Sequence, residues 1–137
     1  MVPENLKYTK EHEWLKMEDD LAVIGLTDFA QEHLGDITYV ELPETGEQLE
    51  QMARLGSVES VKAVSDIFSP LSGEVAELNK FLLDRIKGEE NPEFHPEYIN
   101  QSPYDKGWVI KIKPADLSEI NSLLTPQAYE KLLEEEG

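Results

Sequence analysis

A single lysine between two β-rich runs is the residue with the clearest chemical potential in this sequence. Lys62 separates the runs at residues 55–61 and 64–68, and its neighbours Val61 and Ala63 are small or β-branched. If residues 61–65 form a tight hairpin, Lys62 is held at an exposed tip on a rigid base. A lysine amine can form a stable amide, and its flexible stem adds reach. Such a lysine could anchor a tethered arm, although spacing alone agrees better with an ordinary surface lysine.

Other residue types offer little chemistry of their own. His12, His33 and His95 lack the spacing of metal ligands. The serines are not framed as in a nucleophile elbow, and Gly56 and Gly73 stand too far apart for a phosphate-binding loop. The chain has no cysteine, which excludes disulfides and thiolate metal sites. We therefore expect a protein that is not an enzyme by itself and whose redox chemistry, if any, comes from an attached group.

Composition and charge narrow the class of partner. The 137 residues fit one domain, and 39% hydrophobic with 30% charged residues is ordinary for a globular protein. Twelve basic against 29 acidic residues give a net charge of −17. This charge repels nucleic acids and anionic lipid, and it suits a monomer that docks transiently on positive surfaces. From charge alone, simple solubility is the favoured interpretation. Apolar runs are too short for a membrane span, and no signal-peptide or transit layout begins the chain.

Short strands separated by turn residues must position the lysine. A helix from Thr27 to His33 is predicted by the capping hydroxyl and by the stop at Gly35. Turn residues recur every eight to twelve positions, which is typical of a sandwich or barrel. The predicted strands cover residues 13–17, 21–26, 37–42, 55–61, 64–68, 75–78 and 108–113.

The C-terminal part of the chain changes to a helical period. Apolar residues recur at three-and-four spacing over residues 117–124 and again over 129–133. Thr125 followed by Pro126 is a good helix start between them. We expect two short amphipathic helices on the barrel, and a frayed, solvated end at residues 134–137.

The residues around Lys62 closely resemble a known modification motif. VESVKAVSD at residues 58–66 is similar to the lipoylation motif of glycine cleavage H-proteins. Further blocks resemble the same family in the same order, so the resemblance covers residues 8–113. Biotin carriers usually flank their lysine with methionines, and Val61 and Ala63 do not fit that pattern. The other blocks are HEW (12–14), IGLTDFAQ (24–31), LGDI (34–37), VELPETG (40–46), SPLSGEV (69–75) and PYDKGW (103–108).

The resemblance implies a fold and a domain organisation. The expected fold is mainly β, a lipoyl/biotinyl-type barrel-sandwich hybrid with short peripheral and C-terminal helices. We expect residues 1–137 to form a single lipoyl-carrier domain, with the barrel at about 8–113 and the C-terminal helices at about 115–135.

The resemblance also implies a function and partners. Lipoic acid attached covalently to Lys62 would take the aminomethyl group of glycine from glycine decarboxylase, a pyridoxal-phosphate enzyme, to the aminomethyltransferase with tetrahydrofolate. Dihydrolipoyl dehydrogenase and a lipoylating enzyme complete the expected partners. The chain would be a non-catalytic carrier in the bacterial cytoplasm, or in the mitochondrial matrix if it is a processed form. One alternative is an H-like carrier serving another pathway, a lipoate relay or sulfur oxidation. The other is an interaction module whose lysine is never modified.

Residue roles follow from the same resemblance. Residues matching Glu13, His33 and Asp66 lie near the loaded arm in this family, and we expect the two carboxylates to stabilise its cationic amine. Glu59 and Gly73 match positions that lipoylating enzymes read. Gly73 has a second interpretation, because it could simply supply a turn with positive φ.

Two segments depart from the family pattern. Residues 83–95, including GEENP at 88–92, form an acidic insertion. A tolerated surface loop is the simpler interpretation, and tuned docking to one partner is the other. QMAR at residues 51–54 stands where the family more often has glycine and lysine. The conformation of this turn therefore does not follow from the resemblance.

Overall fold

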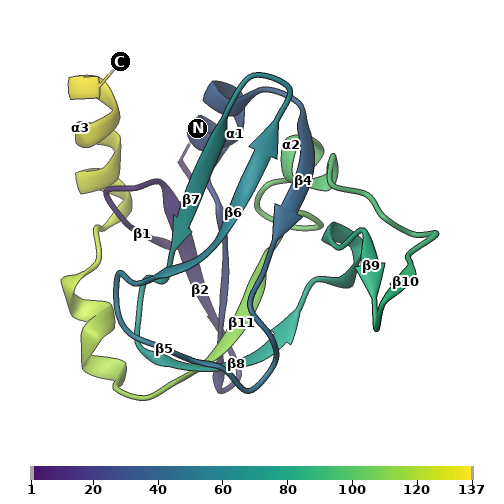
Figure 1. Cartoon of the computed structure of the whole chain (residues 1–137). Coiled ribbons are helices and arrows are strands. Elements are labelled where there is room, and N and C mark those ends of the chain that lie inside the picture. Colours follow the sequence, from purple (N-terminus) through teal and green to yellow (C-terminus); the bar gives the residue numbers. More distant parts are fainter. Residues whose placement is uncertain (1, 137) are drawn as a thin grey trace.

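The computed structural model describes residues 2–136, and its architecture is two facing β-sheets with peripheral helices (Figure 1). The six-stranded sheet has the order β1-β2-β3-β11-β8-β5, and the three-stranded sheet has the order β4-β6-β7. The strands of the larger sheet are β1 (Lys7–Tyr8), β2 (Glu13–Glu18), β3 (Leu21–Leu26), β11 (Ile110–Pro114), β8 (Gly73–Leu78) and β5 (Gln48–Leu49). Those of the smaller sheet are β4 (Ile37–Glu41), β6 (Arg54–Ser60) and β7 (Val64–Phe68).

The hydrophobic core lies between the two sheets. Ile24 and Ile110 pair directly across β3 and β11, and both are fully buried. Val58 and Ile67 contribute from β6 and β7 to the same cluster. Strand residues alternate between faces, so each sheet covers the core with every second side chain. The predicted β-rich body is therefore confirmed.

The helix α1 (Asp28–Leu34) connects the two sheets. The Thr27 hydroxyl accepts a hydrogen bond from the Ala30 amide at 3.3 Å and so caps the helix. Gly35 ends it at φ 82°, and its amide donates to the Gln31 carbonyl at 2.9 Å. The cap at Thr27 and the stop at Gly35 agree with the sequence prediction, because both are local chemistry, and the helix runs one residue beyond the predicted His33.

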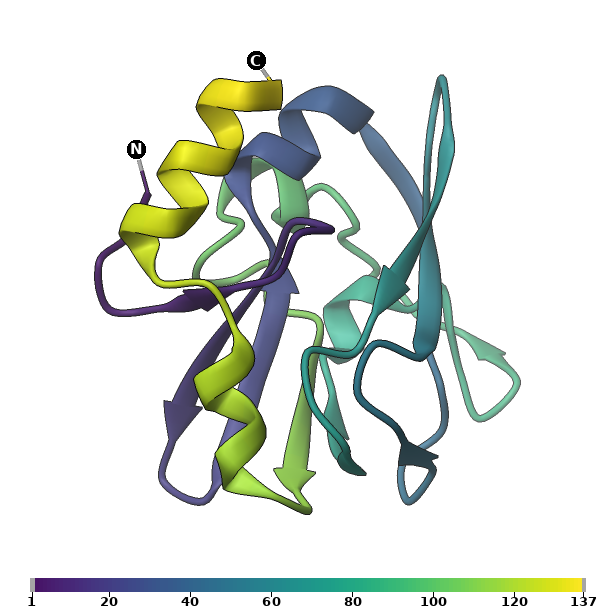
Figure 2. The same ribbon diagram turned by 90° about the vertical axis from the view of Figure 1, so that its left-hand side faces the viewer.

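The C-terminal segment packs along one side of the larger sheet (Figure 2). Residues Leu117–Ser122 form a 3₁₀ helix, η2, and not the predicted α-helix. The helix α3 (Pro126–Glu136) places Tyr129 in a second buried cluster with Tyr8 and Trp14. It continues through residue 136, so the prediction of a frayed end was wrong for residues 134–136; residue 137 lies outside the described part.

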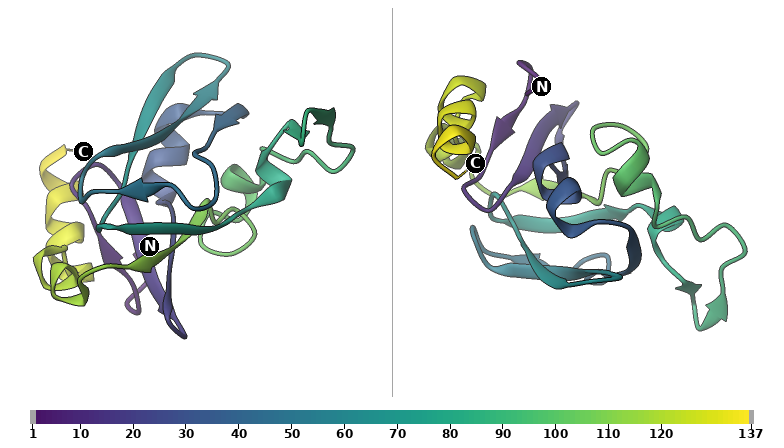
Figure 3. Two further views of the ribbon diagram at one scale, coloured as in Figure 1. Left: turned by 60° about the horizontal axis from the view of Figure 1, so that its bottom comes forward. Right: turned by 90° about the horizontal axis from the view of Figure 1, so that it is seen from above.

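The insertion folds as a small hairpin that projects from the body on the side away from α3 (Figure 3). Its strands β9 (Arg85–Ile86) and β10 (Glu89–Glu90) join through Lys87 and Gly88, which both have positive φ, at 52° and 81°. Two successive positive φ values fit the tightest hairpin turns. The flanking segments are the 3₁₀ helix η1 (Lys80–Leu82) and the helix α2 (Tyr98–Gln101).

Candidate functional site

The tip of the β6–β7 hairpin holds Lys62 in a defined turn. The Ser60 amide donates to the Ala63 carbonyl at 2.8 Å. The Ser60 hydroxyl oxygen accepts from the amides of Lys62 at 3.3 Å and Ala63 at 3.1 Å. The Val61 amide donates to the Asp36 carbonyl at 3.2 Å, which ties the tip to the loop after α1. A serine that bonds its own turn makes the tip a rigid base.

The Lys62 side chain is exposed and lies beside Gly35. A Cβ placed on Gly35 would come within 3.3 Å of Lys62 Cε, so the glycine leaves room for the lysine stem. Among residues 2–136, no carboxylate forms an ion pair with the Lys62 amine. An exposed amine on a fixed turn can be reached by a modifying enzyme, so the site fits a covalent acyl group.

A cleft of about 340 Å³ begins at Leu34, the residue before Gly35, although Lys62 itself does not line it. Its walls come from α1, from Ser65 on β7 and from the end of α3. Phe29 and His33 stack in this cleft with ring centroids 4.0 Å apart. The cleft therefore offers an aromatic surface together with carboxylates, a combination that suits an apolar chain ending in a cation. Its lining includes Glu11, His12, Phe29, His33, Ser65 and Glu136.

His12 is a cleft residue that the sequence patterns did not single out. Its Nδ1 lies 2.8 Å from the Tyr129 hydroxyl and its Nε2 lies 3.0 Å from Glu136 Oε1. These contacts join the loop before β2 to the end of α3, across more than a hundred residues of sequence. No spacing signal connects such distant positions. Residues 2–136 contain no group of three His, Asp or Glu side chains arranged to hold a metal ion.

Glu13 is fully buried and does not line this cleft. The Thr9 hydroxyl donates to Glu13 Oε1, and the Phe68 amide donates to Oε2 at 3.1 Å. Burial raises the pKa of the Glu13 carboxyl to about 7, against the opposing effect of these two hydrogen bonds. The carboxyl therefore links the start of β2 to the end of β7 from inside the molecule.

Asp66 is exposed and lies on the outer face of the small sheet. Its carboxylate accepts from Arg54 Nε at 2.9 Å, and Arg54 also reaches Glu41 at 2.9 Å. Neighbouring strand residues point to opposite faces, and Ser65 is the one that lines the cleft. Of Glu13, His33 and Asp66, only His33 lines the cleft.

Glu59 and Gly73 lie in different sheets. Glu59 is exposed on β6, opposite Val64 and three residues from Lys62. Gly73 has no positive φ, so the prediction of such a turn was wrong. A Cβ there would overlap the Lys113 carbonyl oxygen and lie 2.6 Å from Ile112 Cγ2. The close approach of β8 and β11 requires the glycine.

Two facing sheets that present one lysine at an exposed hairpin tip define a carrier domain of the lipoyl/biotinyl type. The family model for the glycine cleavage H-protein matches residues 6–136, and the chain belongs to that family. Members of this family carry lipoate covalently on a lysine. Both the resemblance seen in the sequence and the expected barrel-sandwich fold are confirmed.

Individual relatives cover nearly the whole chain. The glycine cleavage system H protein of Geobacillus kaustophilus is 51% identical over 134 residues, covering 98% of each sequence. That of Carboxydothermus hydrogenoformans is 45% identical over 137 residues, which is 100% of this chain and 98% of the relative. A crystal structure of a glycine cleavage system H protein from Mycobacterium marinum superposes with a TM-score of 0.83 at 33% identity, covering 97% of this chain and 99% of the other.

Proposed function

We propose that this chain is the lipoylated carrier of the glycine cleavage system, with the lipoyl arm attached to Lys62. It would take the aminomethyl group of glycine from glycine decarboxylase to the aminomethyltransferase and have no catalytic activity alone. The observation that carries the proposal is the exposed amine of Lys62 on a hydrogen-bonded turn. The names of the relatives favour glycine cleavage over a lipoate relay or sulfur oxidation.

The residues around the arm have separate tasks in this proposal. The lipoyl group supplies a dithiol that takes up a one-carbon fragment and is reoxidised afterwards. Ser60 keeps the turn rigid, so that the arm swings from a fixed point. Gly35 lets the lysine stem pass over the end of α1. These contacts fix the base of the arm and leave its far end free to visit several enzymes.

The cleft beside Lys62 is the proposed resting place of the loaded arm. His33 and Phe29 would contact the apolar part of the arm, and the carboxylates of Glu11 and Glu136 would stabilise a cationic amine. A cleft that excludes water would also slow loss of a labile group. Shielding by Glu13 and Asp66 stays a prediction from the family resemblance, and Glu13 would have to be uncovered first because it is fully buried.

The proposed partners follow from the same reaction sequence. Glycine decarboxylase, the aminomethyltransferase and dihydrolipoyl dehydrogenase would each receive the arm in turn. A lipoylating enzyme would act on Lys62 beforehand, and Glu59, exposed on the same hairpin, is a proposed recognition residue. Gly73 is also a proposed recognition residue, because it permits a backbone path that the lipoylating enzyme could contact. We expect the carrier to meet these enzymes as a monomer.

Glycine–bicarbonate exchange reconstituted with glycine decarboxylase tests the proposal. We expect Lys62→Arg to reduce exchange to the level without carrier, because arginine keeps the charge but cannot form the lipoyl amide. Lys131→Arg on α3 is the matched control and should exchange like wild type. Exchange by Lys62→Arg at the wild-type rate would contradict the proposal.

A further inference from the structure

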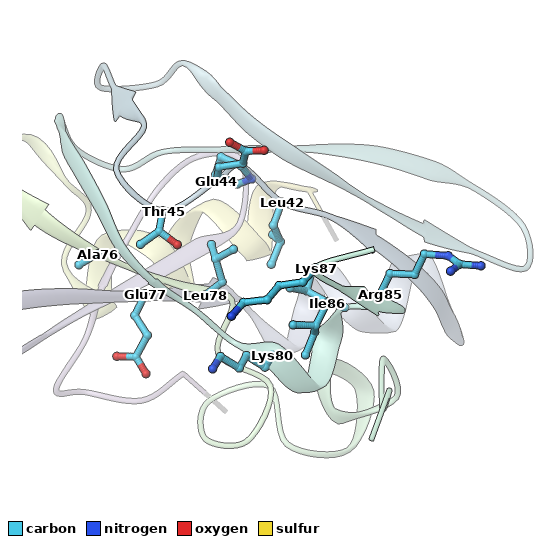
Figure 4. Close-up of a pocket in the computed structure, with 12 residues that line it drawn as sticks. Leu42, Glu44, Thr45, Ala76, Glu77, Leu78, Lys80, Arg85, Ile86 and Lys87 are labelled. Atoms are coloured by element: carbon cyan, nitrogen blue, oxygen red, sulfur yellow. The ribbon is translucent and has the colours of Figure 1, made fainter. Parts of the chain in front are cut away.

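A second cavity, of about 560 Å³, lies at the base of the insertion hairpin (Figure 4). It is larger than the cleft beside Lys62, and it is bordered by the loop after β4, by β8 and by the chain from η1 into β9. The half-buried side chains of Leu42, Leu78 and Ile86 give it an apolar floor. Without the insertion, the wall that carries Ile86 would not exist.

Three cations surround this floor. Lys80, Arg85 and Lys87 all line the cavity and are exposed. The amines of Lys80 and Lys87 extend toward the same side of the cavity, whereas the Arg85 guanidinium points away from it (Figure 4). Within residues 2–136, none of the three forms an ion pair with a carboxylate. The two amines are therefore available to a common negative group.

This charge is unusual for the chain as a whole. Acidic residues outnumber basic residues by 29 to 12, yet at this cavity the two amines of Lys80 and Lys87 are matched by only two carboxylates, Glu44 and Glu77. Glu77 is already held by Lys111, at 3.6 Å. The insertion is acidic in composition, but Glu89 and Glu90 lie on β10 and do not line the cavity. Of the charged side chains on the hairpin, only Lys87 therefore extends toward the cavity, beside Lys80 of η1.

We propose that this cavity docks an acidic segment of a partner enzyme. A carboxylate of that segment would lie between Lys80 and Lys87, and an aliphatic side chain beside it would pack on Ile86 and the rest of the floor. Elsewhere the net charge of −17 opposes an acidic partner, so the complementary patch fixes where such a partner can bind. This docking proposal rests on the proposed function in one respect: the partners to be tested are the enzymes that the carrier is proposed to visit.

The small sheet connects this cavity with the lysine. Its strand β4 begins at Ile37, which pairs with Ser60 at the hairpin tip, and ends at Glu41 opposite Ser57. Leu42 follows directly and lines the cavity. An enzyme held at the cavity would therefore lie along the sheet whose far end carries the arm. That geometry favours a large partner that also receives the arm.

Charge reversal tests the docking site in the lipoylated protein. Glycine decarboxylase, the aminomethyltransferase, dihydrolipoyl dehydrogenase and the lipoylating enzyme are each titrated with the wild type and with Lys80→Glu/Lys87→Glu. We expect the dissociation constant to rise about tenfold or more for at least one enzyme. Ile86→Ser should weaken the same complex without a change of charge. Lys7→Glu/Lys131→Glu is the matched control for net charge and should leave that complex unaffected.

Three outcomes would overturn the proposal. The first is binding to all four enzymes within twofold of wild type. The second is an equal loss in the control variant, which would mean a general effect of charge. The third is a dimer of the wild-type chain in sedimentation that dissociates on reversal at Lys80 and Lys87, which would make a second copy the occupant. Intact mass and glycine–bicarbonate exchange of the same samples report separately on the function of Lys62.

Discussion

Two ionisable side chains that the sequence singled out have opposite environments. The Lys62 amine is exposed at the tip of a turn, and the Glu13 carboxyl is fully buried beneath the loop before β2. Exposure leaves the amine open to acylation, whereas burial disfavours the charged form of the carboxylate. The hydrogen bonds from Thr9 and Phe68 satisfy both oxygens of Glu13. Glu13 therefore has a structural task in the folded chain whatever its relation to the arm.

The raised pKa of Glu13 should appear in the pH dependence of stability. The pKa is about 7 in the folded chain against a reference value of 4.5, so the native state keeps a proton that the unfolded state releases between those values. The free energy of unfolding should then fall as pH rises through this window, by up to about 3 kcal/mol, and level off above about pH 7.

Glu13→Gln isolates this effect from the other carboxylates. The glutamine can accept from the Phe68 amide and donate to the Thr9 oxygen, but it does not titrate. Chemical denaturation from about pH 5 to about pH 8 should show the variant gaining stability relative to wild type as pH rises. A difference between the two proteins that does not change with pH would rule out a buried, protonated Glu13.

The close contact between strands β8 and β11 explains why residue 73 is a glycine, whereas the sequence motif shows only that a glycine is present. Gly73 belongs to the block SPLSGEV at residues 69–75, and the sequence left it open between turn geometry and enzyme recognition. The structure shows a strand residue with no positive φ, pressed against Ile112 and Lys113 of β11. The packing of β8 on β11 is sufficient reason for glycine at this position.

Gly73→Ala should destabilise the fold. The added methyl group meets backbone that cannot rotate away, and overpacking of this kind costs about 1–3 kcal/mol. Denaturant titration measures the loss, and mass spectrometry of the folded fraction measures lipoylation. We expect lipoylation of that fraction to remain complete. Normal stability with no lipoylation would show instead that the modifying enzyme reads Gly73.

Sequence signals that act within a few residues predicted the positions of most helices and strands. They did not predict which residues far apart in the sequence are in contact. Thr27 and Gly35 marked the ends of α1 because a capping hydroxyl and a positive φ act within one turn of helix. Turn residues between short β-rich runs indicated the strands in the same way. The joining of His12 to Tyr129 and Glu136, and the outward pairing of Asp66 with Arg54, depend on how segments pack. The acidic composition of the insertion likewise gave no sign that the Lys87 amine would lie on the same side of a cavity as that of Lys80.

Over the whole molecule, the arm and the insertion hairpin occupy different ends of the β-structure (Figures 1 and 3). The hairpin with Lys62 projects beyond α1, and the cationic cavity lies where β4 leaves the small sheet. A net charge of −17 favours transient docking on positively charged partner surfaces. The proposed cavity adds one site where a negatively charged partner segment can bind. A carrier that visits several enzymes can use such separate surfaces to distinguish them.

Intact-mass spectrometry of the protein made in lipoate-replete cells tests whether Lys62 carries the lipoyl arm. We expect the added mass of one lipoyl group, located by peptide mapping on Lys62, and no addition to Lys62→Arg. Unmodified wild-type protein, or a lipoyl group on another lysine, would contradict it.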